Sequence, residues 1–396
     1  MQTTASTTSR PLSAVAGVQP RAVGRLFFVD NIRVFLTILV LLHHFMITYA
    51  HSGDWYYNEG QPDFATEAIG NWFCSVNQAY FMGLFLLISA YFVPGSYDRK
   101  GAWRFFKDRL IRLGIPLAVF TWVINPLFVY ALNYRTITKS FLQFFLSDFF
   151  KTNPLLGGGP LWFVEVLLIF SLVYVLWRLL TSSRPATVNE ESAFPGNWTI
   201  ALFALLLGVA GFIVRLAFPI GYTFKPLNLQ FPFFAQYIVL FIVGLIAYRR
   251  NWLVNLPEKT ARLWLWISIL IILLWAPLMI AVGAIENDIP LRGGWHWQAM
   301  VAALWESFLC VGMCISVVNI FRRSVNSRGK FADFLVPNAY AAYIIHAPVI
   351  TFLAIWTRNI ALYPLLKWAL FAPVALALCF GLSAMIRKIP YTDRVL

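Results

Sequence analysis

Ionisable side chains that interrupt long apolar segments are the residues of this chain most suited to chemistry. An ionisable group at the centre of a bilayer costs at least about 2.5–3.5 kcal/mol, so each one is a candidate functional residue. Imidazole can act as a general base or a nucleophile, and the forked donors of guanidinium suit phosphate. The candidates in or at the entrance of apolar segments are Arg33, His43, His44, Arg109, Arg112, Glu165, Arg215, Glu306 and His346.

The segment FVDNIRVFLTILVLLHHF carries two adjacent histidines at its far end. We expect Asp30 to help start a helix there by capping free N–H groups. Arg33 would then lie near the membrane interface, with His44 roughly 16 Å deeper at 1.5 Å per residue. His43 and His44 point about 100° apart, so only one can face a given cavity. A buried histidine can be a mere packing residue, but within a bilayer we expect one of this pair to be functional.

Two arginines stand three residues apart in FFKDRLIRLGIP, where another apolar segment begins. Arg109 and Arg112 would project from one face of the entering helix. Such a pair can hold phosphate groups in a forked arrangement. It can equally anchor the helix at the positively charged side of the membrane. The sequence leaves both interpretations open for this pair.

Two later segments hold further polar candidates. Glu165 lies one turn inside a segment that opens with Trp162, and we expect its carboxylate to pair with a histidine or arginine from another span. In YAAYIIHAPVI, Tyr343 and His346 share one helix face. Arg215 and Glu306 are expected to form ion pairs rather than to act in catalysis.

The elements that carry these residues must be membrane helices. The chain is 60% hydrophobic and 12% charged, with a mean hydropathy of +0.69, whereas soluble proteins are about 25% charged. This composition excludes a water-soluble enzyme, a disordered regulator and a coiled coil, and it predicts an all-α polytopic membrane protein. Runs of about 20 apolar residues predict ten spans, at 33–50, 69–93, 110–133, 161–181, 198–218, 232–248, 262–284, 297–320, 339–357 and 362–386.

The net charge of +14 is distributed unevenly between the two sides of these spans. The amino-terminal tail and alternate loops hold 23 of the 31 cations, and the opposite side holds 8. Cytoplasmic loops retain Lys and Arg, so both termini are expected in the cytoplasm, which requires an even number of spans. The positive charge then reflects topology, and nucleic acid is not an expected partner.

The ends of the chain and its cysteines add three expectations. Residues 1–24 are rich in Thr, Ser and Ala and are expected to be a disordered cytoplasmic tail rather than a signal peptide. Residues 25–390 would form one membrane domain, and 391–396 a short cytoplasmic tail. All four cysteines fall in expected spans, which argues against a disulfide framework, and no metal site is expected.

The order and spacing of several motifs resemble the type 3 membrane acyltransferases. VDNIR with His44 is similar to the family's Arg-x10-His pattern, and Arg109 with Arg112 is similar to its Arg-x-x-Arg pair. GPLWFVEVLLIFSLVY, FAQYIVLFIVGLIAYRRNWL and NAYAAYIIHAPV are similar to its later blocks. The resemblance covers about residues 25–390, and within the family it looks most like the glucan biosynthesis protein C-like branch. One departure is Ala90, where the family commonly has glycine, and a larger residue there is expected to crowd a close helix contact.

The resemblance implies transfer of an acyl group, of acetyl or succinyl type, from a cytoplasmic acyl-CoA to a hydroxyl of an envelope carbohydrate. Arg33, Arg109 and Arg112 would handle the donor, and His44 would be catalytic, as general base or as acylated nucleophile. Glu165 would orient the His44 ring or hold the acceptor. Supporting roles are expected for Asp30, His43, Trp162, Tyr343 and His346. Acyl-CoA would be a co-substrate with no bound cofactor, and the location would be the plasma (inner) membrane.

A proton-coupled secondary transporter of a small solute is the alternative function. The same intramembrane histidines and glutamate could serve it as a proton relay. Against it stand the lack of a recognisable inverted repeat and an arginine pair suited to a bulky anionic donor. The sequence does not identify the acceptor, the acyl group or the oligomeric state.

Overall fold

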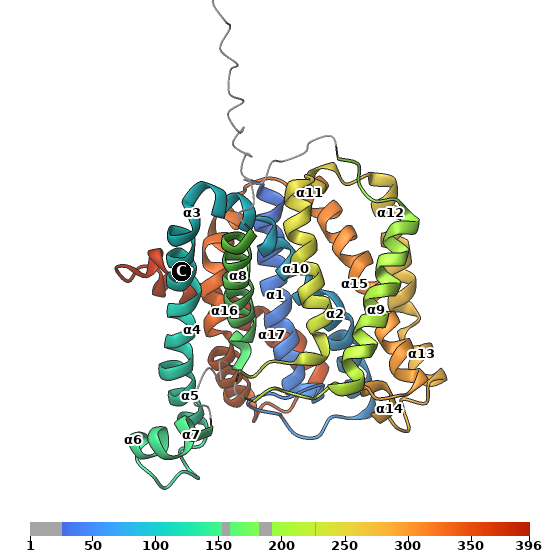
Figure 1. Cartoon of the computed structure of the whole chain (residues 1–396). Helices are drawn as coiled ribbons and strands as arrows, with labels where there is room; N and C mark the ends of the chain where they lie inside the picture. Colours follow the sequence, from blue (N-terminus) through green and yellow to red (C-terminus); the bar gives the residue numbers. More distant parts are fainter. Residues whose placement is uncertain (1–25, 153–158, 182–191, 226) are drawn as a thin grey trace, which may run out of the picture.

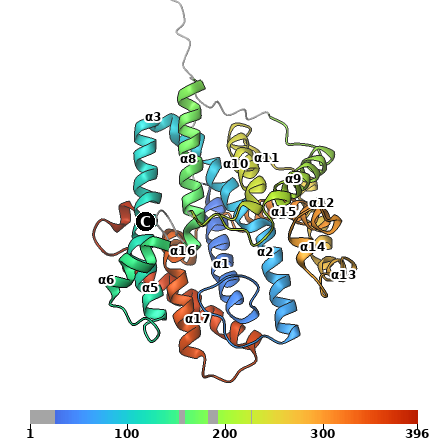
Figure 2. The same cartoon turned by 60° about the horizontal axis from the view of Figure 1, so that its bottom comes forward.

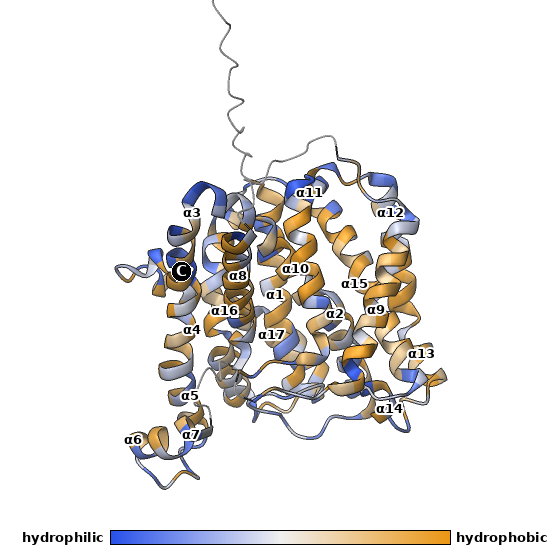
Figure 3. Ribbon diagram, viewed as in Figure 1, coloured by the Kyte–Doolittle hydropathy of each residue, from blue (hydrophilic) through white to orange (hydrophobic). Residues whose placement is uncertain are grey.

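The computed structural model describes residues 26–152, 159–181, 192–225 and 227–396. Within these ranges the regular secondary structure is helical, apart from an isolated bridge between Phe224 and Leu229, and turns and loops join the helices. The long helices stand side by side (Figure 1). Their middle parts are mainly apolar and hydrophilic residues gather towards their two ends (Figure 3), as expected of a bundle that spans a bilayer. The expected disordered tail, 1–24, lies outside the described residues.

The expected all-α membrane architecture with about ten spans is confirmed. In the described part of the chain, nine helical segments are long and apolar enough to cross a membrane, and a tenth crossing is available if a bent helix pair counts as one span. The segments are Phe27–Ala50 (α1), Phe64–Tyr91 (α2), Val93–Leu132 (α3 to α5), Gly159–Thr181 (ending in α8), Asn197–Ala217 (α9), Phe231–Arg249 (ending in α10), Trp297–Ser324 (α15), Lys330–Thr357 (α16) and Pro364–Ile386 (α17). The bent pair is α12 (Glu258–Leu273) with α13 (Trp275–Ala281), at 46°.

The bent pair does cross from one face of the bundle to the other. Leu256, just before α12, accepts a hydrogen bond from Arg322 near the end of α15 at 2.7 Å. Gly294, just before α15 begins, donates to the carbonyl of Arg215 at 3.0 Å. Because α15 spans the whole bundle, Leu256 and Gly294 lie at opposite faces, and the chain between them must cross. This gives ten crossings.

Contacts between the ends of other helices agree with ten crossings. At one face, Asn31 near the start of α1 donates to the carbonyl of Val325 after α15, at 2.6 Å. At the other, Glu59 between α1 and α2 accepts a hydrogen bond from Lys367 at the start of α17, at 2.5 Å. The N-cap residue of α1 is Leu26, so Asp30 is not at the capping position where it was expected. The helix already begins at Phe27, so Asp30 lies inside its first turn.

The third span is interrupted at two points. It consists of α3 (Val93–Arg109), α4 (Ile115–Val119) and α5 (Asn125–Leu132), separated by π-helical turns at Leu110–Gly114 and Phe120–Ile124. Proline lacks the N–H of a regular helical bond, and one follows each π turn, Pro116 and Pro126 respectively. Single π turns inside helices frequently occur at functional sites.

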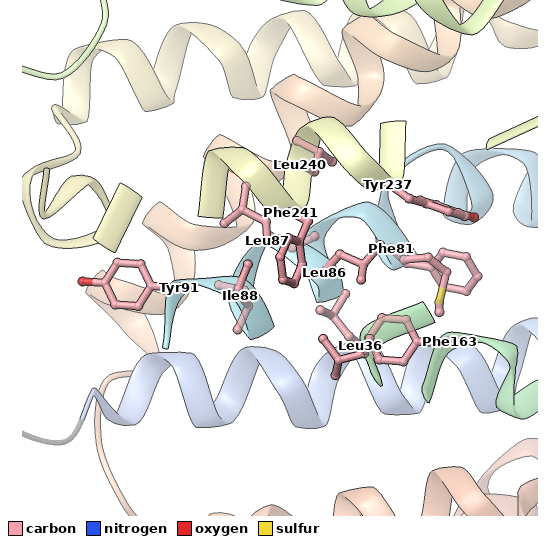
Figure 4. Close-up of a cluster of buried hydrophobic side chains, with 14 of the residues drawn as sticks. Leu36, Phe81, Leu86, Leu87, Ile88, Tyr91, Phe163, Tyr237, Leu240 and Phe241 are labelled. Atoms are coloured by element: carbon pink, nitrogen blue, oxygen red, sulfur yellow. The ribbon is translucent and has the colours of Figure 1, made fainter. Parts of the chain in front are cut away.

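Helix α1 occupies the centre of the bundle. It packs against α2, α15, α16 and α17, and Figure 2 shows it between α2 on one side and α16 and α17 on the other. Figure 4 shows the apolar cluster that fixes its position, in which Leu36 of α1 faces Phe163 of α8, with Phe81 and Leu86 of α2 nearby. This packing fixes the helix that carries both Arg33 and His44.

The expected crowding at Ala90 is avoided by a glycine on the neighbouring helix. Ala90 is fully buried in α2 and faces Gly244 of α10 (Phe234–Arg249). A Cβ atom on Gly244 would lie 2.7 Å from that of Ala90 and 2.3 Å from the carbonyl oxygen of Leu87. The small residue that lets the two helices approach therefore lies on α10.

Candidate active site

Two histidines from different helices meet in the interior of the bundle. Nδ1 of His44 on α1 lies 3.0 Å from Nε2 of His346 on α16. The ring centroids are 5.0 Å apart and the ring planes are inclined by 20°. His43 points elsewhere: its ring packs 5.1 Å from that of Phe81 on α2. Of the adjacent pair, the structure thus brings His44 into a polar contact and leaves His43 against the apolar core.

An aromatic side chain from the loop after α1 covers the His44 ring. The ring of Trp55 stacks on His44 with centroids 4.4 Å apart and planes inclined by 13°. Trp55 also lies 6.0 Å from His346 by centroid. Sequence reasoning did not identify Trp55, because nothing in the spacing of a loop residue shows that it folds back towards a helix interior.

The loop that carries Trp55 is held at its far end. Lys367, fully buried in α17, forms an ion pair with Glu59. Asp63 accepts hydrogen bonds from Thr66 and, at 3.1 Å, from the hydroxyl of Tyr363. The bond from the Thr66 hydroxyl is the main reason why the pKa of Asp63 is lowered from its ordinary value. These contacts tie the loop to α2 and α17.

Tyr343 holds His346 on α16. The carbonyl oxygen of Tyr343 lies 2.5 Å from Nδ1 of His346, and the two rings lie 5.5 Å apart with planes inclined by 27°. The Tyr343 hydroxyl donates to the carbonyl of Pro160, before α8 (Trp162–Thr181). Trp162 lies outside this group and stacks on Tyr237 at 5.3 Å. Tyr343 and His346 therefore contact each other as their spacing predicts.

The three predicted donor-binding arginines lie near one another at the other end of α1. The guanidinium groups of Arg33 and Arg112 lie near enough to that of Arg109 for their charges to influence it. Arg33 also lies 3.5 Å from Asp30 and packs over the ring of Phe92. Arg112 is exposed, and Arg33 and Arg109 are partly exposed. Three guanidinium groups in this arrangement can bind a polyanion such as a phosphate chain.

Helices α1 and α16 connect the arginine group with the histidine pair. Arg33 and His44 are eleven residues apart on α1, which gives roughly 16 Å of rise and nearly the same helix face. On α16, the Tyr340 hydroxyl donates to the carbonyl of Arg112 at 2.8 Å, and His346 contacts His44 less than two turns further along. The basic entrance and the buried imidazole thus lie at two depths along the same pair of helices.

The expected pairing of Glu165 is wrong. Its side chain is 1% exposed, and neither carboxylate oxygen has a hydrogen-bond partner in the described part of the chain. Glu165 was expected to orient the His44 ring or to hold the acceptor, and the ring's hydrogen-bond partner is His346. The i,i+3 spacing in the sequence identified the face of α16 that carries His346. It could not show that this face packs against α1, because the packing of two helices distant in the chain cannot be read from one sequence.

Two other groups of buried polar residues are not part of this site. Arg215 and Glu306 form the expected ion pair at 2.5 Å between α9 and α15. The cysteines at positions 74, 310, 314 and 379 are buried and free. Among the described residues, no group of three or more His, Cys, Asp or Glu side chains is arranged to hold a metal ion.

Comparison with known proteins matches residues 26–384 to the family model described as "Acyltransferase domain". The chain is 28% identical over 235 residues to proteins named "Glucans biosynthesis protein C" from Salmonella heidelberg, Salmonella schwarzengrund and Salmonella agona. Each alignment covers 57% of this chain and 58% of the relative, so the matched region spans little more than half of these proteins. No solved structure matches the chain significantly.

Proposed function

This chain belongs to the acyltransferase family whose domain covers residues 26–384, and from that premise we propose that it transfers an acyl group from acyl-CoA to a hydroxyl of an envelope carbohydrate. The name of its relatives, "Glucans biosynthesis protein C", favours a glucan as the acceptor. The proposed transferred group is an acetyl or a succinyl group. The location would be the plasma (inner) membrane, which the protein crosses several times.

The observation that carries the proposal is the placement of a basic entrance and a buried imidazole at two depths along α1. Acyl-CoA has its phosphates and its thioester at opposite ends of a long pantetheine arm. The rise of roughly 16 Å from Arg33 to His44 is comparable with that arm in an extended conformation. Phosphates held by Arg33, Arg109 and Arg112 would let the thioester reach His44.

The orientation follows from the charge distribution. We propose that the cation-rich face, which carries the arginine group, is cytoplasmic, with both termini on that side. The donor would then enter from the cytoplasm. The acceptor would enter from the opposite face, where the loop with Trp55 lies, and Glu165 is the proposed acceptor-side carboxyl group. The membrane domain would bring both substrates to His44.

His44 would promote attack of the acceptor hydroxyl on the thioester carbon. As a general base it takes the hydroxyl proton, while as a nucleophile it first takes the acyl group on a ring nitrogen. Either route breaks the carbon–sulfur bond and leaves CoA with a free thiol after protonation. Exclusion of bulk water by the apolar bundle would limit hydrolysis of the thioester.

Purified protein in liposomes, supplied with labelled acyl-CoA and a glucan acceptor, tests this function. We expect labelled glucan and free CoA from the wild type, and a loss of about 10²–10⁴-fold in the His44→Ala variant. His296→Ala is the matched control, because His296 is an exposed histidine at the start of α15, and it should leave the rate unchanged.

Two outcomes would contradict the proposal. Retained acyl transfer in folded His44→Ala protein would remove His44 from the chemistry. Uptake of an intact solute into the liposomes, driven by a proton gradient and without release of CoA, would show the transporter instead. Labelled glucan appearing only when acyl-CoA is supplied on the arginine side would support the proposed direction of transfer.

A further inference from the structure

The contacts of His346 determine which of its ring nitrogens carries a proton. Its Nδ1 lies 2.5 Å from the carbonyl oxygen of Tyr343, and a carbonyl oxygen can only accept. Nδ1 of His346 must therefore donate. A neutral imidazole has one protonated and one bare nitrogen, so Nε2 of His346 is then an acceptor.

The same pairing of one donor with one acceptor determines the protonation of His44. Its Nδ1 lies 3.0 Å from the accepting Nε2 of His346, so Nδ1 of His44 must be the donor. The ring centroids lie 5.0 Å apart, well beyond the 3.0 Å between these nitrogens, so the two rings approach each other through their nitrogen edges. His44 then has a proton on Nδ1 and a bare Nε2.

The surroundings favour two neutral rings. His346 is fully buried, and an extra charge at that depth in a membrane is costly without a partner. In the described part of the chain, no carboxylate forms a hydrogen bond or ion pair with either ring. Glu165, although buried, directs no hydrogen bond to them.

We propose that His346 is a positioning residue that holds His44 in the tautomer protonated on Nδ1, so that Nε2 is the reacting atom. This inference rests on the proposed acyl transfer. Tyr343 in turn holds His346 through its carbonyl oxygen and stacked ring, and Trp55 holds the plane of His44. The contacts from the Tyr343 carbonyl through His346 would hold the His44 ring in one tautomer and orientation, as a carboxylate does beside many catalytic histidines.

Both routes are consistent with a bare Nε2. As a base, Nε2 of His44 takes the acceptor's hydroxyl proton while that oxygen attacks the thioester carbon. The carbon–sulfur electron pair goes to sulfur, and the proton passes from Nε2 to the thiolate. As a nucleophile, Nε2 attacks the carbon and expels the thiolate, the hydroxyl oxygen then displaces the imidazole, and its proton goes to the thiolate. In each cationic intermediate, Nδ1–H still donates to His346.

Nuclear magnetic resonance of protein labelled with ¹⁵N and ¹³C in histidine tests the assignment without using activity. The chain has 5 histidines, and the His44 signals are identified by their loss in a His44→Gln variant. We expect wild-type His44 to carry its proton on Nδ1. His346→Phe removes the acceptor and should shift His44 towards the Nε2-protonated form. His346→Gln retains an acceptor oxygen and should keep the Nδ1 proton.

Kinetics provide the second measurement. We expect His346→Phe to lower kcat by up to about 10²-fold, because the His44 ring is misplaced, with little change in the KM for acyl-CoA. His346→Gln should recover much of that loss. The control His296→Phe should alter neither quantity. A wild-type His44 protonated on Nε2 would overturn the proposal, and so would a folded His346→Phe protein with unchanged tautomer and kcat.

The two proposals can fail separately. The predicted tautomer in a protein that transfers no acyl group would contradict the proposed function and leave the assignment of His346 standing. Acyl transfer by a wild-type protein whose His44 is protonated on Nε2 would support the proposed function and contradict the assignment of His346. If His346→Phe does not fold, the wild-type and His346→Gln spectra decide the question.

Discussion

At the scale of residues, the cost of an ionisable group in a bilayer was enough to single out His44 and Arg109 as candidate residues, because few such groups occur in the apolar segments. This cost alone does not distinguish a candidate catalytic group from a buried ion pair, since Arg215 and Glu306 carry the same cost and form an ion pair. Trp55 was missed because a tryptophan in a loop has no such cost. Contacts between residues of different helices had to come from the structure.

The arginine group permits a prediction that separates donor binding from simple anchoring. Replacing Arg109 by Ala should raise the KM for acyl-CoA about 10- to 100-fold, because a hydrogen bond to a charged group contributes about 1.5–3 kcal/mol. The value of kcat at saturating donor should change far less, since the arginine is distant from the thioester. Initial rates over a range of acyl-CoA concentrations measure both quantities.

Arg104 is the matched control for this measurement. It is exposed and lies on α3 more than one turn before Arg109, where we expect it to anchor the helix. Arg104→Ala should leave the KM nearly unchanged. Equal effects of the two substitutions would show that the arginines act only through general positive charge at this face.

At the scale of elements, the ten spans could be predicted because a bilayer demands about 20 apolar residues for each helical crossing. The interruptions of the third span could not, although Pro116 and Pro126 were visible in the sequence. Proline marks where a regular helix is disturbed, but whether a π turn or a kink results depends on neighbouring helices. The close approach of α2 and α10 could not be predicted either, because it depends on Gly244 facing Ala90, and these residues are far apart in the sequence.

Gly244 supports a prediction about stability. In a Gly244→Ala variant the new Cβ atom would lie 2.3 Å from the carbonyl oxygen of Leu87, so α2 and α10 must separate. Overpacking of this kind costs about 1–3 kcal/mol. We expect a lower Tm in detergent, measured by the fluorescence of the tryptophans or by loss of the monodisperse peak on heating.

Gly381 in α17 provides the control, because a Cβ atom there meets nothing within 4 Å. Gly381→Ala should keep or slightly raise the Tm, since alanine favours a helix by about 0.8–1.0 kcal/mol over glycine. A Gly244→Ala protein as stable as the wild type would show that the two helices can adjust at no cost.

At the scale of the whole molecule, the charge distribution and the helix-end contacts give the same arrangement by independent routes. The 23 cations assigned to one side from sequence include Arg178 and Arg322. In the structure these two bind partners at the ends of other helices: Arg178 pairs with Asp98, and Arg322 donates to Leu256. From the sequence, the loops could be assigned to one side of the membrane or the other only by the empirical rule that Lys and Arg are retained in the cytoplasm. In the structure, contacts between helix ends show which ends lie at the same face, independently of charge.

The orientation in the cell can be tested with introduced cysteines, because the four native cysteines are at most 6% exposed. Glu286 is exposed between α13 and α14 (Ile289–Arg292), and Ser327 is exposed between α15 and α16 at the cation-rich face. A membrane-impermeant thiol reagent added to intact spheroplasts should label the Glu286→Cys variant. It should label Ser327→Cys only after the membrane is opened, because we place that loop in the cytoplasm. The reverse pattern would put the arginine group outside, where acyl-CoA is absent, and would contradict both the orientation and the proposed entry of the donor.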